Sequence, residues 1–211
     1  GSVVSYPIDG SGGLGEAATF IQHEGSSIGP RQSEAHAHCF KIADDGRFAF
    51  SADLGMDRVM IYALDAASGT LTPGEQAFAR VAPGEGPRHF TIAPNNSQAY
   101  VINEIGNTVT AFDYDAERGL LLERDTITTI PEGYDGTTHT ADLCLTPDGR
   151  FLYGSNRGHD SIAMYRVDGG SGGLTPIGIE LCGEPSPQNL TMSADGKLLF
   201  VALSTTGKIL A

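Results

Sequence analysis

The chain repeats one turn signal four times at a nearly constant interval. The signal is a pair of turn-forming residues, and its copies are Asp45-Gly46, Asn95-Asn96, Asp148-Gly149 and Asp195-Gly196, spaced 50, 53 and 47 residues apart. Each copy separates two short apolar segments. A repeat of this length leaves few architectures open, because each unit must bury its apolar face against the next one.

Each unit contains four strand-like segments. One segment precedes the turn and three follow it. After the first turn the three are Arg47–Ser51, Arg58–Tyr62 and Glu75–Val81. The opening segment Ser2–Tyr6 matches the third segment of an earlier unit. Four strands in about 50 residues are typical of a β-propeller blade, and no segment has a sustained helical period. We therefore predict an all-β propeller of four-stranded antiparallel blades. The alternative is an irregular β-sandwich whose turns are similar by chance.

The two ends of the sequence do not coincide with the boundaries of the repeated unit. The chain starts inside one third strand and stops inside another at Lys208–Ala211, so it holds about four blades' worth of strands. We expect residues 1–211 to form a single propeller domain. Two interpretations are open: a small ring of four blades, or an internal part of a larger ring, whose cut edges would be exposed.

The charge balance argues against two classes of partner. The chain has 13 Lys and Arg against 26 Asp and Glu, a formal net charge of −13. Nucleic acids and anionic membranes both need a basic face, so we expect neither as a partner. No apolar run approaches the ~20 residues of a membrane helix, and no signal segment opens the sequence. Three widely spaced cysteines suit a reducing compartment. The expected location is the cytoplasm, or the periplasm if a signal segment lies upstream.

Polar residues collect at one end of the predicted hairpins, opposite the turns. In an antiparallel hairpin the start of one strand pairs with the end of the next, so residues about eight positions before and seven or eight after each turn meet there. The innermost strands of a propeller then bring these ends together at the mouth of its central channel. The residues at these positions are His38, Asp53, Arg88, Asn103, Glu104, Asn156, Arg157 and, in the fourth unit, Gln188 and Ser204.

Charged groups at strand ends are commonly solvated, but two Arg, a Glu and a His converging on one rim favour a functional site. His36 lies two residues before His38 and points to the same face if the strand is extended. His-x-His can bind metal, yet no third ligand follows at a diagnostic spacing, so we predict no metal site. His23 falls in a loop, where we expect it to face solvent.

Seven short motifs, taken in order, resemble those of the seven-bladed β-propeller lactonases. They are Ala35–His38, Ser51–Gly55, Gly86–His89, Asn103–Glu104, Ala141–Asp142, Pro147–Tyr153 and Ser155–Gly158. A further segment, Ala99–Asn103, resembles the less specific repeats of surface-layer propellers. The resemblance covers essentially the whole chain. The family includes propeller-type 6-phosphogluconolactonase and carboxy-cis,cis-muconate cyclase, and it implies seven blades, of which about four are present here.

The resemblance places the catalytic residues at the positions that the hairpin count had already selected. They would be His38, Arg88, Glu104 and Arg157, with His36, Asp53, His89, Asn103, Asn156 and Gln188 as substrate-binding residues. One departure is Pro187-Gln188, where the family usually has Pro-Arg. This leaves the identity of the substrate more open than the class of reaction.

The implied activity is hydrolysis of a sugar lactone, foremost 6-phosphogluconolactone, without a cofactor. His38 and Glu104 are the candidates for acid and base, in an order that the sequence does not decide, and Arg88 and Arg157 would hold the oxyanion and the substrate's anionic group. The expected partner is a small anionic lactone, and the oligomeric state is open. The alternatives are a propeller that only binds a partner and a muconate-type cycloisomerase on the same site.

Overall fold

The fold consists of β-strands connected by turns and loops. The computed structural model describes residues 1–211 and contains 17 strands. Their bounds are β1 Ser2–Ser5, β2 Thr19–Gln22, β3 Ala37–Ile42, β4 Phe48–Asp53, β5 Arg58–Asp65, β6 Thr70–Arg80, β7 Pro87–Ile92, β8 Gln98–Asn103, β9 Thr108–Asp115, β10 Leu120–Thr128, β11 His139–Leu145, β12 Phe151–Arg157, β13 Ser161–Val167, β14 Leu174–Leu181, β15 Pro187–Met192, β16 Leu199–Leu203 and β17 Ile209–Leu210.

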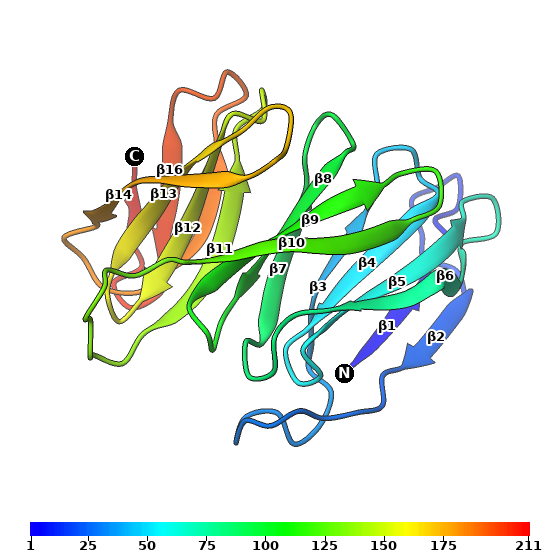
Figure 1. The fold of residues 1–211 in the computed structure, drawn as a ribbon. Helices are drawn as coiled ribbons and strands as arrows, with labels where there is room; N and C mark the ends of the chain where they lie inside the picture. Colours follow the sequence, from blue (N-terminus) through cyan, green and yellow to red (C-terminus); the bar gives the residue numbers. More distant parts are fainter.

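The strands form five antiparallel sheets that stand side by side (Figure 1). Three sheets have four strands in sequence order: β3–β6, β7–β10 and β11–β14. Two smaller sheets flank them, β1–β2 at one end and β15–β17 at the other. The prediction of an all-β fold with four-stranded antiparallel blades is confirmed. These five sheets do not form the small ring of four blades, because the first and last lie at opposite ends of the row.

The repeated turns form because one residue in each adopts a left-handed backbone. Gly46 has a φ of 71°, Asn96 of 53°, Gly149 of 72° and Gly196 of 69°. Glycine adopts this conformation without strain, and Asn is the side chain that tolerates it best. In the first turn the Asp45 carboxylate also accepts a 3.0 Å hydrogen bond from the backbone N–H of Arg47. Local turn chemistry therefore fixes the hairpin register that the mouth of the propeller depends on.

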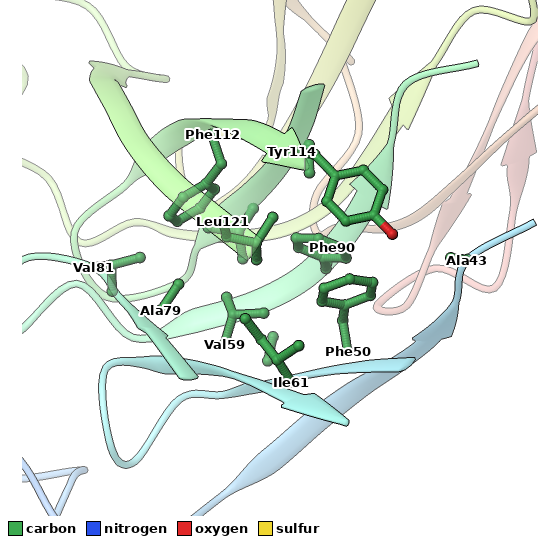
Figure 2. Packing of buried hydrophobic residues seen from close by; sticks show 13 residues of the cluster. Ala43, Phe50, Val59, Ile61, Ala79, Val81, Phe90, Phe112, Tyr114 and Leu121 are labelled. Atoms are coloured by element: carbon green, nitrogen blue, oxygen red, sulfur yellow. The ribbon is translucent and has the colours of Figure 1, made fainter. Parts of the chain in front are cut away.

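The core lies between the blades. Between the β3–β6 and β7–β10 sheets, the rings of Phe50 and Phe90 stack with centroids 5.0 Å apart (Figure 2). The ring of Tyr114 meets that of Phe50 edge-on, with centroids 5.5 Å apart. Strand β4 is buried along nearly its whole length rather than at alternate residues. This pattern is expected for a strand whose sheet is covered on both faces.

The two flanking sheets expose apolar side chains. Phe20 of β2 is 65% exposed, and Ile8, between β1 and β2, is 72% exposed. Ile209 of β17 is 71% exposed. The structure has no helix of the length and apolar character that a membrane crossing requires.

Candidate active site

A β-bulge recurs near the start of every inner strand. The regular pairing of β3 with β4 breaks at His38, that of β7 with β8 at Arg88, and that of β15 with β16 at Gln188. In β11 the extra residue falls at Ala141–Asp142. A bulge turns a side chain away from the direction that the pleat would give it. The four bulges lie at corresponding places in neighbouring inner strands, so they act on the same end of the channel.

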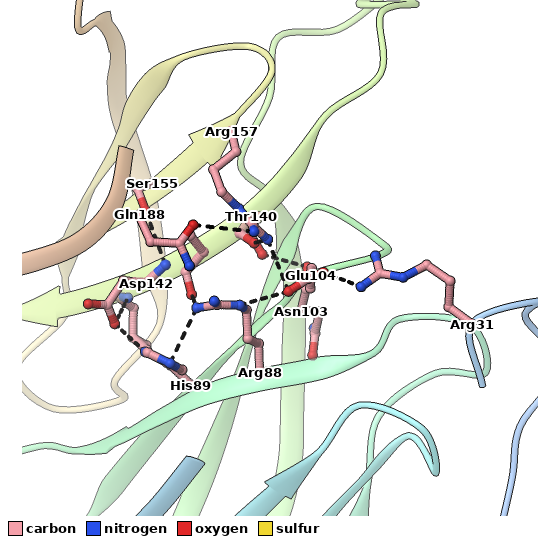
Figure 3. A network of polar contacts seen from close by, with 12 residues as sticks. Arg31, Arg88, His89, Asn103, Glu104, Thr140, Asp142, Ser155, Arg157 and Gln188 are labelled. Carbon is pink, nitrogen blue, oxygen red and sulfur yellow. Dashed lines mark hydrogen bonds and ion pairs between the residues drawn. The ribbon is translucent and has the colours of Figure 1, made fainter. Parts of the chain in front are cut away.

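Glu104 is the centre of the charged groups at this end (Figure 3). Its Oε1 accepts a 2.6 Å hydrogen bond from Nη2 of Arg31, and its Oε2 accepts one of 2.7 Å from Nε of Arg88. Nη2 of Arg157 lies 3.0 Å from the same Oε2. Three guanidinium groups therefore share one buried carboxylate, and both of its oxygens are occupied.

These contacts determine the charge state of the carboxylate. Burial alone raises the pKa of Glu104, but the hydrogen bond from Arg31 and the charges of Arg157, Arg31 and Arg88 outweigh burial and hold the pKa below its usual value. Burial and the charge of Arg157 lower the pKa of Arg88, and Glu104 opposes both effects. Glu104 is thus ionised at neutral pH and orients the guanidinium groups around it.

His38 faces the same space without a carboxylate partner. Its side chain is exposed, and its ring centroid lies 5.2 Å from that of His89. Loss of solvation, together with the charges of Arg88 and His89, lowers the pKa of His38 to about 4, against a smaller opposing effect of Glu104. His38 is therefore a neutral imidazole at neutral pH, with a lone pair available to accept a proton.

His89 is held by a buried carboxylate on the next blade. Its Nδ1 lies 2.5 Å from Oδ1 of Asp142, and its Nε2 lies 3.3 Å from Nη1 of Arg88. Asp142 itself accepts backbone hydrogen bonds from Leu143 at 2.9 Å and Leu190 at 2.8 Å. Because Arg88 can only donate, the Nδ1–H of a neutral His89 points to Asp142 and its Nε2 accepts from Arg88. The Asp142–His89 pair thus supports the position of Arg88.

Arg31 reaches Glu104 from the connection between β2 and β3. This segment is fixed by Gln32, which is fully buried and donates to the carbonyl of Leu54 at 2.8 Å and to Oδ1 of Asp57 at 2.7 Å. Ser27 donates to the other oxygen of Asp57. The backbone that carries Arg31 is therefore anchored, although its side chain is 49% exposed.

These groups line a pocket of about 550 Å³, here called the mouth pocket. Its lining residues are Pro30, Arg31, Ser33, His36, His38, Leu54, Arg88, Glu104 and Arg157. A second cavity of about 600 Å³ lies beside the turn at Asp148–Arg150, where the two charged side chains bind each other. The structure gathers no three His, Cys, Asp or Glu side chains in an arrangement that could hold a metal ion.

The structure brings together most of the predicted site residues. His36, His38, Arg88, Glu104 and Arg157 all line the mouth pocket. Two more stand directly behind these residues. Gln188 accepts a 3.4 Å hydrogen bond from Nη1 of Arg157, and His89 contacts Arg88.

Three predicted substrate-binding residues are placed elsewhere. Asp53, Asn103 and Asn156 are fully buried at the ends of their strands. The Asp53 carboxylate accepts a 2.8 Å hydrogen bond from the backbone of His36, and Asn156 donates at 2.9 Å to the carbonyl of Thr129. Each precedes the residue that faces the pocket in its blade, and successive strand residues point to opposite sides. They brace the connections around the pocket and do not line it.

The expectation that His23 faces solvent is wrong. Its side chain is fully buried, with Nδ1 at 2.6 Å from Asp53 and Nε2 at 2.6 Å from the hydroxyl of Tyr62. The buried carboxylate at the end of β4 needs a partner, and the loop supplies this histidine.

Comparison with known proteins identifies the family. The family model described as "Lactonase, 7-bladed beta-propeller" matches residues 1–211. The chain belongs to the seven-bladed β-propeller lactonase family. Among its relatives, a protein of Bacillus subtilis named 6-phosphogluconolactonase is 34% identical over 175 residues, which are 82% of this chain and 49% of the relative. An uncharacterized protein of Lactococcus lactis is 36% identical over 181 residues, 86% of this chain and 50% of the relative.

Solved structures of lactonase propellers superpose closely on this one. A putative 6-phosphogluconolactonase of Bacteroides fragilis has a TM-score of 0.90 at 36% identity and covers 99% of this chain and 59% of its own. A periplasmic gluconolactonase of Pseudomonas aeruginosa also has a TM-score of 0.90, at 29% identity, with 99% and 61% covered. The chain spans about half the length of the curated relatives that it matches.

Two residues around the mouth pocket were not predicted as site residues. Arg31 lies in the connection between β2 and β3, which is longer than the corresponding connections β6–β7, β10–β11 and β14–β15, so counting from the turns cannot reach it. Asp142 appears in one of the family-like motifs, but the bulge in β11 is what aims it at His89. A one-residue bulge leaves no signal in the spacing of the turns.

Proposed function

We propose that the mouth pocket hydrolyses a sugar lactone, with 6-phosphogluconolactone as its main substrate. The observation that carries the proposal is the pairing of a neutral, exposed His38 with guanidinium groups that the ionised Glu104 holds in place. Lactone hydrolysis needs a base to activate water and fixed positive groups where the oxyanion develops. Membership of the lactonase family and the name of the Bacillus subtilis relative support the same reaction.

His38 is the base in this proposal, and Glu104 is not. Both carboxylate oxygens of Glu104 are bonded to guanidinium groups, which a water molecule would have to displace before Glu104 could take its proton. His38 has no such partner. It takes a proton from water as the water oxygen attacks the carbonyl carbon of the lactone.

Arg157 and Arg88 stabilise the oxyanion that this attack creates. Arg157 is 23% exposed at its side chain and can donate directly, whereas Arg88 is 5% exposed and acts mainly through its charge. The negative charge of the oxyanion counteracts the positive charge of Arg88, which contributes to the low pKa of His38. The imidazolium form of His38 therefore becomes more stable as the intermediate forms. His38 then returns its proton to the ring oxygen as the carbon–oxygen bond breaks, and the product is the open-chain acid.

The test is the rate of 6-phosphogluconolactone hydrolysis by the native full-length protein, measured above the spontaneous rate. We expect a clear acceleration that His38→Gln lowers by about 10²–10⁴-fold in kcat/KM and Arg157→Gln by about 10²–10³-fold. Arg124→Gln is the matched control, since Arg124 pairs with Asp113 on an exposed outer strand. A folded protein that gives no acceleration, or whose activity survives His38→Gln, overturns the proposal.

A further inference from the structure

Arg31 differs from the other two arginines around Glu104 in how many of its donors are free. A guanidinium group has five N–H donors. Arg31 uses one of them, toward Oε1 of Glu104. Arg88 donates to Glu104, His89 and the carbonyl of Ala141. Four donors of Arg31 thus have no partner within residues 1–211.

Arg157 is also more committed than Arg31. Besides its contact with Glu104, it donates to the carbonyl of Thr140 at 2.8 Å and to Gln188 at 3.4 Å. Its side chain is 23% exposed, against 49% for Arg31. Among the three guanidinium groups, that of Arg31 is therefore the most available to a ligand.

The position of Arg31 separates it from the other two. It binds Oε1 of Glu104 and approaches from the opposite side to Arg88 and Arg157, which share Oε2 (Figure 3). The carboxylate thus lies between a pair of arginines and a single one. A ligand across the pocket can place one oxygen-rich group at the pair and a second, anionic group at Arg31.

The charge of the pocket favours an anion at this point. Apart from its histidines, the lining has three arginines and one glutamate, a net charge of +2, in a chain whose formal net charge is −13. Positive charge is therefore concentrated locally, and the anchored backbone at Gln32 holds Arg31 there without a ligand. A preformed guanidinium fork suits phosphate, which offers several acceptor oxygens.

We propose that Arg31 is a specificity-determining residue that binds the phosphate group of the substrate, while the lactone carbonyl lies at Arg88 and Arg157. The inference rests on the proposed lactonase function and adds the placement of the substrate. Glu104 holds Arg31 in position, and the phosphate engages the donors that Glu104 leaves free.

The test compares 6-phosphogluconolactone with the uncharged glucono-δ-lactone in the native full-length protein and in Arg31→Gln, Arg31→Lys and Arg124→Gln. Loss of Arg31 disturbs Glu104 and lowers kcat/KM for both lactones, so the readout is the ratio between them. We expect Arg31→Gln to lower the preference for the phosphorylated lactone by about 10–100-fold. Arg31→Lys keeps the charge without the fork and loses less, and Arg124→Gln leaves the ratio unchanged. An equal loss on both lactones overturns the inference.

An equilibrium measurement separates this inference from the proposed function. Calorimetric titration with 6-phosphogluconate and with gluconate needs no turnover. Tighter binding of the phosphorylated acid that Arg31→Gln abolishes supports the role of Arg31, even if no lactone is hydrolysed. Equal affinity for the two acids in the wild-type protein overturns that role, whatever the lactonase assay shows. Thermal unfolding of Arg31→Gln confirms that the variant is folded.

Discussion

Replacing Glu104 with Gln tests whether one buried carboxylate organises the site. Gln keeps the size of the side chain but removes the charge that three arginines share. Arg88 is buried with only His89 and a backbone carbonyl as other partners, so its charge is left without compensation. Removing one partner of a buried ion pair costs about 3–5 kcal/mol, and the half-exposed Arg31 contact adds little to that.

The assay is thermal unfolding of the native full-length protein and its Glu104→Gln variant at pH 7. The shift is roughly 2–4 °C per kcal/mol for 150–250 residues and falls with size, so for a protein as long as the curated relatives, of which this chain spans about half, the expected loss in Tm is about 5 °C. Activity on the lactone falls as well, by about 10²-fold or more, because Arg88 and Arg157 lose the group that orients them.

The pH dependence of the same comparison gives a sharper test. The folded-state pKa of Glu104 lies below its usual value, so its contribution is fully present above the unfolded pKa and is lost as the pH falls through the folded one. The difference in stability between wild type and Glu104→Gln is therefore large at pH 7 and shrinks toward pH 3. A difference that stays constant over this range, or no difference at pH 7, refutes the electrostatic explanation.

Two further substitutions test the supports of the site. In Asp142→Asn one carboxylate oxygen becomes an NH₂ donor. Oδ2 accepts from Asn189 and the backbone of Leu190 at 2.6 and 2.8 Å, and Oδ1 accepts from the backbone of Leu143 at 2.9 Å, so either orientation of the amide sets a donor against a donor. We expect a loss of about 2–3 kcal/mol in unfolding free energy and lower kcat/KM, and an unchanged Tm would contradict the role of this carboxylate. Gly55→Ala would bring a Cβ to 1.8 Å from the carbonyl oxygen of Glu34, in the segment that carries Arg31. We expect a loss of about 2 kcal/mol or more in the free energy of unfolding, and a weaker preference for the phosphorylated lactone. Gly10→Ala, which meets no neighbour, is the control, and equal stability of the two alanine variants would contradict the packing argument.

The strands and the hairpin register could be predicted from the sequence because both are determined locally. Each turn needs a residue with positive φ, and Gly46, Asn96, Gly149 and Gly196 stand where that conformation occurs. Counting outward from these turns therefore identified Arg88 and Glu104, which meet in the structure.

The orientation of individual side chains was harder to predict. The count treated the seventh and eighth residues after each turn as equivalent, yet Asn103 is fully buried and Glu104 faces the pocket. The strand pleat separates the two positions, and which face lies toward the channel depends on how the blades pack. On β3, the bulge at His38 decides the direction of the ring, and the bulge exists only when β3 pairs with β4.

Contacts between distant segments account for the rest of the site. Arg31 and Glu104 are 73 residues apart, and His89 and Asp142 are 53 apart. The first spacing matches no interval between turns. The second equals the interval from Asn96 to Gly149, so turn counting places His89 and Asp142 at equivalent positions in neighbouring blades without predicting that their side chains meet. The burial of His23 against Asp53 has the same origin, because a loop residue satisfies a carboxylate on a separate strand. These features follow from tertiary packing of the blades.

The most direct test of the account is the dependence of kcat/KM for 6-phosphogluconolactone on pH. A folded-state pKa of about 4 keeps His38 unprotonated, and active as a base, down to roughly that pH. The account predicts catalysis above the spontaneous rate that is constant near neutrality and falls with a midpoint near pH 4. A midpoint near 6.5, the ordinary value for histidine, or no catalysis by the folded full-length protein, would contradict it.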